Sequence, residues 1–213
     1  STSLEIFQNS DIIFLCVKPN DLQELFLELK ESIGNQIIIS IAAGKKISFY
    51  CQAIGNKKIV RLMPNIAALA GESMNVFTSI NLSANEKDEV TLLLELCGPT
   101  IELEEKHFDA VTALSGCGPA FVALFAESLI QAGQNNGLNR DIARSLAIQT
   151  IFGTTKLLRE HNLEPDKIIE MVSSPNGSTI AGSKILEENE FVKIVIRAID
   201  ASRKKSVELG ENE

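Results

Sequence analysis

The stretch Ile12–Pro19, IIFLCVKP, decides the fold class of this chain of 213 residues. Its uninterrupted apolar run ends in a lysine and a proline, which is typical of a strand buried on both faces of a parallel sheet. Two similar runs follow at residues 37–41 and 59–63, each separated from the previous strand by a segment with helical spacing. This βαβαβ order predicts a doubly wound parallel sheet, an α/β fold of the Rossmann type.

The segments between these strands carry the signals of helix ends. Asn20 is the expected N-cap of the first helix, and Gly34 its expected end. A second, shorter helix is expected at residues 48–54, ended by Gly55. Two more strands and a further helix are expected at residues 76–80, 100–103 and 85–97.

Beyond residue 106 the strand signals stop and helical periods take over. We therefore expect two domains, a partial dinucleotide-binding domain at residues 1–106 and an all-α domain at residues 107–213. Pro119, Asn139 and Pro165 are expected in the first turn or at the cap of successive helices. Helices this apolar on several faces commonly bury the excess against another subunit, so the second domain predicts a homodimer or a higher homo-oligomer.

Composition excludes several classes of partner. The net charge of -8 argues against general binding to nucleic acid or to an anionic membrane surface. The uninterrupted apolar runs are shorter than the about 20 residues of a membrane-spanning helix. His107 and His161 are isolated from other metal-binding side chains, so no metal site is expected. The four cysteines do not show the paired spacing of metal ligands, and each lies in an apolar or glycine-containing segment. This predicts buried free thiols and a cytoplasmic location. The four are Cys16, Cys51, Cys97 and Cys117.

The segment at residues 171–186, MVSSPNGSTIAGSKIL, predicts a helix N-terminus that binds an anion. Asn176 and Gly177 can turn the chain, and the first N–H groups of the helix that follows lack intrahelical partners. Ser174, Ser178 and Thr179 add hydroxyl groups at the positive end of the helix dipole. An ordinary capped helix explains any single one of these hydroxyls, but their convergence favours a site for a carboxylate.

A dinucleotide is expected at the carboxyl ends of the strands, where Lys18 with Pro19 and Ala42 with Ala43 fall. However, the glycine-rich phosphate loop G-x-G-x-x-G occurs nowhere in the sequence. Either a first βαβ unit precedes Ser1, or the fold never bound a nucleotide. An opening strand in such folds normally has a neighbour on each side, so we expect the first of these.

Five segments resemble pyrroline-5-carboxylate reductase in order and spacing, and the likeness covers essentially the whole chain. They are SDIIFLCVKP at residues 10–19, IAAG at 41–44, RLMPN at 61–65, LSGCGPAF at 114–121 and VSSPNGSTIAG at 172–182. The resemblance implies a reductase that delivers hydride from NADPH or NADH to the C=N carbon of a cyclic imine, giving L-proline. Members of this family carry a further N-terminal unit with the glycine loop.

The resemblance also implies roles for individual residues. The cofactor is expected against the backbone of two segments: Cys16, Val17, Lys18 and Pro19 in the first, and Ile41, Ala42 and Ala43 in the second. The substrate carboxylate is expected at the loop 174–179, with Ser174 in support and the Thr179 hydroxyl at the ring nitrogen. Most members carry glycine where this chain has Asn176, and asparagine is the non-glycine residue that best accepts positive φ.

Two other functions compete with this one. A hydroxyacid dehydrogenase would need a lysine and an asparagine four residues apart after the G-x-G turn, where this chain has Val122 and Ala126. Those residues cannot do acid–base work. The chain could also be a dimerising scaffold that has lost its cofactor, although a scaffold has no need of the hydroxyl cluster at residues 174–179.

Overall fold

The computed structural model describes residues 2–211. The elements of the first half are α1 (Ser3–Gln8), β1 (Ile12–Leu15), α2 (Leu22–Leu29), β2 (Ile37–Ser40), α3 (Ile47–Ile54), β3 (Lys58–Met63), β4 (Asn75–Ile80), α4 (Ala84–Glu95) and β5 (Thr100–Glu102). Those of the second half are α5 (Phe108–Val111), α6 (Gly118–Asn135), α7 (Arg140–Glu160), α8 (Pro165–Val172), α9 (Ser178–Glu188) and α10 (Phe191–Glu211). An α/β half followed by a helical half is confirmed.

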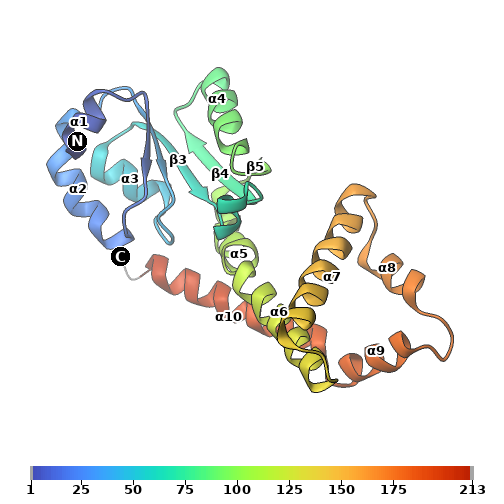
Figure 1. The fold of residues 1–213 in the computed structure, drawn as a ribbon. Helices are drawn as coiled ribbons and strands as arrows, with labels where there is room; N and C mark the ends of the chain where they lie inside the picture. Colours follow the sequence, from blue (N-terminus) through green and yellow to red (C-terminus); the bar gives the residue numbers. More distant parts are fainter. Residues whose placement is uncertain (1, 212–213) are drawn as a thin grey trace. The chain divides into compact units, whose positions relative to one another are not determined.

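The five strands form one sheet in the order β1-β2-β3-β4-β5 (Figure 1). β1, β2 and β3 run parallel, and the register pairs Leu15 with Ser40 and Ser40 with Arg61. The expected βαβαβ unit is therefore present. Because the three strands are parallel, their carboxyl ends lie at one edge of the sheet.

The parallel arrangement expected from the βαβαβ order holds for β1, β2 and β3 but does not extend to β4. This strand runs antiparallel to β3, with Leu62 opposite Phe77, while β5 runs parallel to β4. A parallel connection needs a crossover of about a dozen residues or more, usually through a helix. Residues 64–74 form only a short 3₁₀ turn and a loop, so the chain returns beside β3 in the opposite direction.

Apolar side chains cover both faces of the sheet. One buried cluster joins β1, β2 and β3 to α1, α2 and α3, and it includes Phe26, Ile38 and Tyr50. The cluster on the opposite face joins the same sheet to α4 through Val60 and Val90. These two layers explain why residues 37–40 are buried along their whole length.

Two details of the first βα unit differ from the sequence expectation. Phe14 is 43% exposed, because β1 is an edge strand of the described sheet and only its other face is buried. Asn20 does not cap a helix: Pro19–Asp21 forms a 3₁₀ turn, and α2 begins at Leu22 without a side-chain cap. Proline fixes φ near −65°, which favours a helical turn that starts at Pro19 itself.

Residues 105–135 form a continuous helical stretch that contains one π turn, at Thr112–Gly116. Pro119 is the second residue of α6, the helix that follows this turn. Within the described residues, this is the one helical stretch long and apolar enough, by length and composition, to cross a membrane. The uninterrupted apolar runs of the sequence did not indicate this helical stretch, because small and polar residues such as Ser115 and Gly118 interrupt its apolar pattern.

The described chain forms two compact units, one up to Pro119 together with the residues from Ile199 onward, and one at Ala120–Ala198. In the second unit, α6 and α7 pack closely: a β-carbon at Gly133 would lie 2.8 Å from the β-carbon of Ala143. The expected cap of α7 is confirmed, since Asn139 Oδ1 accepts from the N–H of Ile142 at 2.9 Å.

The C-terminal part of α10 belongs to the first unit and is anchored there by two contacts. The Ser206 hydroxyl donates to Asp109 Oδ1 at 2.7 Å, across 97 residues of sequence. A β-carbon at Gly210 would lie 3.1 Å from the carbonyl oxygen of Gly44. The last turn of α10 therefore packs backbone against backbone on the loop that follows β2.

Candidate active site

The loop between α8 and α9 and the first turn of α9 contain the five residues expected to bind the substrate. The N–H of Gly177 donates to the carbonyl oxygen of Ser174 at 2.9 Å, which closes a tight turn. Asn176 adopts φ 59° in this turn, a conformation that asparagine tolerates better than other non-glycine residues. The left-handed turn suggested by the sequence is therefore present.

Gly177 is required by space and not by its φ of −76°. A β-carbon at this position would lie 2.5 Å from Ser174 Oγ and 2.9 Å from the Ser174 carbonyl oxygen. Any larger residue would open the turn. Because residue 177 has no side chain, the hydroxyl of Ser174 can lie against the start of α9.

The first turn of α9 presents donors to solvent. Gly177 is its N-cap and has no side-chain acceptor, so the N–H groups of the first turn are not capped by the loop. Ser174 and Ser178 are exposed and Thr179 is half-buried, which leaves their hydroxyls accessible. Hydroxyls and free amides at the positive end of a helix form a binding site for an anion such as a carboxylate.

The edge of the parallel sheet brings together the two segments expected to bind the cofactor. The loops after β1 and β2 start at Cys16 and Ile41, and the parallel register places them beside each other. Val17, Lys18 and Ala43 are exposed, whereas Ala42 is buried. This is the edge at which open α/β sheets bind their ligands.

The residues at this edge fit a dinucleotide. The loop after β2 starts at Ile41 and continues with the small residues Ala42, Ala43 and Gly44, of which Gly44 adopts φ 83° and packs against Gly210. Small side chains allow a ligand to approach the backbone closely, and Val17 and Ala43 are exposed at this edge. The residues present thus suit a cofactor bound mainly through backbone contacts.

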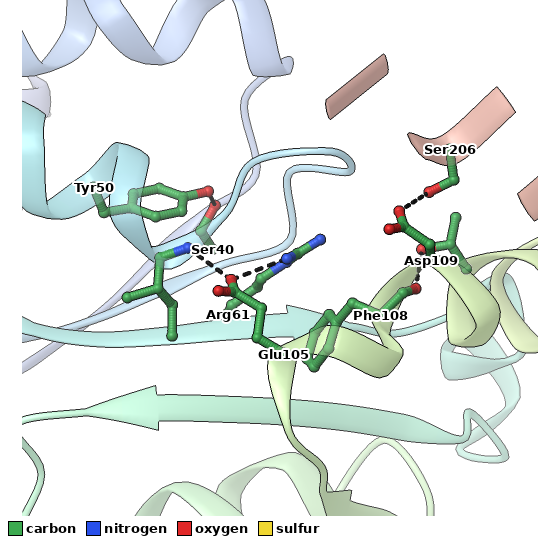
Figure 2. A network of polar contacts seen from close by, with 9 residues as sticks. Ser40, Tyr50, Arg61, Glu105, Phe108, Asp109 and Ser206 are labelled. Carbon is green, nitrogen blue, oxygen red and sulfur yellow. Dashed lines mark hydrogen bonds and ion pairs between the residues drawn. The ribbon is translucent and has the colours of Figure 1, made fainter. Parts of the chain in front are cut away.

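An ion pair between a buried arginine and a half-buried glutamate lies beside this edge and was not predicted from the sequence (Figure 2). Arg61 in β3 is 4% exposed, and its NH1 donates to Glu105 Oε1 at 3.0 Å. The same oxygen accepts from the backbone N–H of Ile47 at 2.7 Å. A charged residue inside an apolar strand is rarely buried without a partner, and this was the available signal.

A second interaction links residues 61–65 to residues 114–121, two of the segments that resemble the reductase family. The Asn65 side-chain amide donates to Ser115 Oγ at 3.2 Å, and Asn65 Oδ1 accepts from the N–H of Ala67. A β-carbon at Gly116 would lie 3.4 Å from Met63 Sδ. The π turn is therefore fixed against the carboxyl end of β3.

The cysteines are free, as expected, but their predicted burial was wrong. Cys16 and Cys97 are exposed, and Cys51 and Cys117 are half-buried. Cys16 comes directly after a strand, and Cys97 follows the end of a helix. Both positions lie in connections, which run over the surface.

The helical part matches a known dimerisation domain. Residues 105–209 match the family described as pyrroline-5-carboxylate reductase dimerisation, and residues 1–44 match the family described as NADP oxidoreductase, coenzyme F420-dependent.

Curated relatives match nearly the whole chain. Pyrroline-5-carboxylate reductase of Aquifex aeolicus is 41% identical over 203 residues, 94% of this chain and 76% of the relative. The enzyme of the same name from Arabidopsis thaliana is 37% identical over 215 residues, covering 100% of this chain and 78% of the relative.

Solved structures give the same result. Pyrroline carboxylate reductase of Plasmodium falciparum with NADP bound superposes with a TM-score of 0.93 at 35% identity, covering 99% of this chain and 81% of that chain. A pyrroline-5-carboxylate reductase from Coxiella burnetii gives a TM-score of 0.88 at 28% identity, with 95% and 77% covered. The resemblance found in the sequence motifs is confirmed, and the chain belongs to the pyrroline-5-carboxylate reductase family.

Proposed function

We propose that this chain reduces 1-pyrroline-5-carboxylate to L-proline at the expense of NADPH or NADH, the final step of proline synthesis, and that the loop 174–179 binds the substrate. The observation that supports substrate binding by this loop is the geometry of the loop. A closed turn, a glycine without space for a side chain and an uncapped helix N-terminus converge on one accessible surface. The chemistry of that surface fits the carboxylate of the substrate.

The carboxylate is bound by the first turn of α9. The N–H groups of Ser178 and Thr179 donate to it, and the Ser174 hydroxyl adds a donor from the turn. Asn176 and Gly177 give the backbone the shape that these contacts need. The negative charge of the substrate interacts favourably with the positive end of the α9 dipole.

In this proposal the Thr179 hydroxyl contacts the ring nitrogen. A pyrroline nitrogen is basic enough to be protonated as an iminium near neutral pH, so no strong general acid is required. The Thr179 hydroxyl accepts from the protonated nitrogen and fixes the orientation of the ring. Most of the catalysis then comes from alignment of the reacting atoms.

The cofactor is held by backbone groups of Cys16, Val17, Lys18 and Pro19 after β1 and of Ile41, Ala42 and Ala43 after β2. When bound, the reduced nicotinamide supplies the hydride that the C=N carbon receives. The small side chains after β2 allow close approach, and Lys18 adds a positive charge near the edge of the sheet.

The protein acts as a homodimer or a larger homo-oligomer in the cytoplasm. Apolar side chains on the helices of the second unit are exposed in the single chain, among them Leu124, Leu146 and Phe152. The dimerisation family matches this part of the chain, which supports a second copy as the cover for these faces in place of a lipid bilayer. Free thiols support a reducing compartment.

The reductase assay tests this proposal. The full-length protein is mixed with NADPH and pyrroline-5-carboxylate, and NADPH oxidation is followed by its absorbance together with the L-proline formed. We expect equal amounts of NADPH consumed and proline produced. A protein that neither binds nor oxidises NADPH would support the dimerising scaffold.

A further inference from the structure

Helix α3 begins without a local cap. Lys46 precedes it and makes no side-chain hydrogen bond to the first turn, and a cation at a helix N-terminus interacts unfavourably with the dipole. The carboxylate of Glu105, 58 residues further along the chain, accepts from the N–H of Ile47 at 2.7 Å. A distant acidic side chain thus replaces the missing cap (Figure 2).

Arg61 fixes the position of this carboxylate. Its guanidinium donates to the same Glu105 oxygen at 3.0 Å and lies 4.5 Å above the ring of Phe108. Arg61 is buried in β3, opposite Ser40 of β2 and Thr78 of β4 in the sheet register. Because the middle of a paired strand is rigid, the carboxylate has a fixed support.

The loop between β2 and α3 is also anchored at its start. Ser40 Oγ accepts from the N–H of Ala42 at 3.3 Å and from the Tyr50 hydroxyl at 2.7 Å. Gly44, in the middle of the loop, packs against the backbone of Gly210. The segment 41–46 is therefore fixed at its start by Ser40, in its middle by Gly210 and at its end by Glu105.

We infer that Glu105 is a positioning residue for cofactor binding, which acts by fixing the end of the loop 41–46 through its hydrogen bond to Ile47 and its ion pair with Arg61. The inference rests on the proposed function, in which the backbone of Ile41, Ala42 and Ala43 binds the dinucleotide. Glu105 does not touch the cofactor. It keeps the loop in its binding conformation before the cofactor arrives, which lowers the entropic cost of binding.

Glu105→Gln tests the inference, with the neighbouring Glu104→Gln as its matched control. The Glu104 side chain is 72% exposed and pairs with the exposed Lys106. We expect Glu105→Gln to raise the Kd for NADPH at least fivefold, measured by quenching of NADPH fluorescence. The kcat at saturating NADPH and the KM for pyrroline-5-carboxylate stay within twofold of wild type. Glu104→Gln leaves all three values unchanged.

Hydrogen exchange of the cofactor-free protein provides a second readout. We expect the amides of Ala42 and Ile47 to exchange at least threefold faster in Glu105→Gln than in Glu104→Gln. A merely stabilising role would lower the Tm without changing the NADPH Kd or the local exchange. That outcome would overturn the inference.

Two further variants distinguish a failure of the positioning role from a failure of the proposed cofactor site. If Glu105→Gln does not fold, the double variant Arg61→Met with Glu105→Ala removes the buried arginine charge together with its partner, and the NADPH Kd must still rise at least fivefold. Ala43→Asp, at an exposed position within the loop, tests the proposed cofactor site itself. An unchanged Kd in Ala43→Asp would contradict the cofactor site, whereas an unchanged Kd only in the Glu105 variants would contradict the positioning role.

Discussion

The hydroxyl of Ser174 and the α-carbon of Gly177 approach so closely that a β-carbon at residue 177 would lie 2.5 Å from Ser174 Oγ. The neighbouring carbonyl oxygen of Ser174, which closes the turn, would lie 2.9 Å away. The proposed carboxylate site thus depends on a glycine whose φ is ordinary but whose surroundings leave no space. A side chain at residue 177 would be strained by its contact with Ser174, and this contact lies on the proposed binding surface itself.

Gly177→Ala should therefore lower kcat/KM for pyrroline-5-carboxylate at least tenfold, which corresponds to about 1.4 kcal/mol of transition-state binding. The reason is that the turn must open and move the Ser174 hydroxyl away from the start of α9. Steady-state kinetics measure the effect. Gly182→Ala in the same helix is the control, because a β-carbon there meets no atom within 4 Å. Unchanged kinetics in Gly177→Ala would show that the turn does not shape the site.

Thr179→Ala should lower kcat at least tenfold, about 1.4 kcal/mol, because the hydroxyl that orients the ring nitrogen is lost. Thr179→Ser keeps the hydroxyl and should retain most of the activity. The kcat of both variants at saturating substrate separates loss of the hydroxyl from loss of the methyl group. Wild-type turnover in Thr179→Ala would remove this residue from the mechanism.

Glu86 gives the fold a defined pH dependence. The side-chain hydrogen bond from Lys58 and the hydrogen bonds from Ser83 lower the pKa of its carboxyl from 4.5 to about 2. A lowered pKa in the folded state means that the carboxylate stabilises the fold above pH 4.5, and that this contribution is lost as the pH falls towards about 2.

Glu86→Gln should accordingly lower the free energy of unfolding at pH 7, and the difference from wild type should shrink between pH 4.5 and 2. Urea unfolding at several pH values measures this difference. Glu89→Gln changes an exposed carboxylate of the same helix and is the control. A Glu86 difference that is independent of pH would contradict the assigned ion pair.

Phe152→Asp should shift the protein from dimer or larger oligomer towards monomer. Phe152 is 57% exposed in the single chain and lies in the part that matches the dimerisation family. A carboxylate buried at an interface without a partner is strongly unfavourable. Sedimentation equilibrium measures the change, and Leu27→Asp, at an 80% exposed position of α2, is the control. If the two variants have the same oligomeric state as wild type, the proposed interface is wrong.

Local signals in the sequence predicted much of the fold. The apolar runs marked the strands, Gly55 ended α3 with φ 79°, and Asn139 capped α7. The turn at Asn176 also followed from a local property, because few residues accept positive φ. Each of these features depends on residues that are close together in the chain.

The features that the sequence did not predict depend on distant contacts. The antiparallel direction of β4 follows from a short connection and not from the apolar pattern of the strand itself. The Arg61–Glu105 pair joins residues 44 positions apart, and the Ser206–Asp109 hydrogen bond joins residues 97 positions apart. Such pairs become visible only when the fold has brought their elements together.

The fate of the transferred hydride tests the central claim most directly. The full-length protein is incubated with pyrroline-5-carboxylate and NADPH that carries two deuterium atoms at C4 of the nicotinamide, and the proline formed is analysed by mass spectrometry. The account predicts L-proline with one deuterium at the carbon that belonged to the C=N bond. Unlabelled proline, or no proline formed from this substrate, would contradict it.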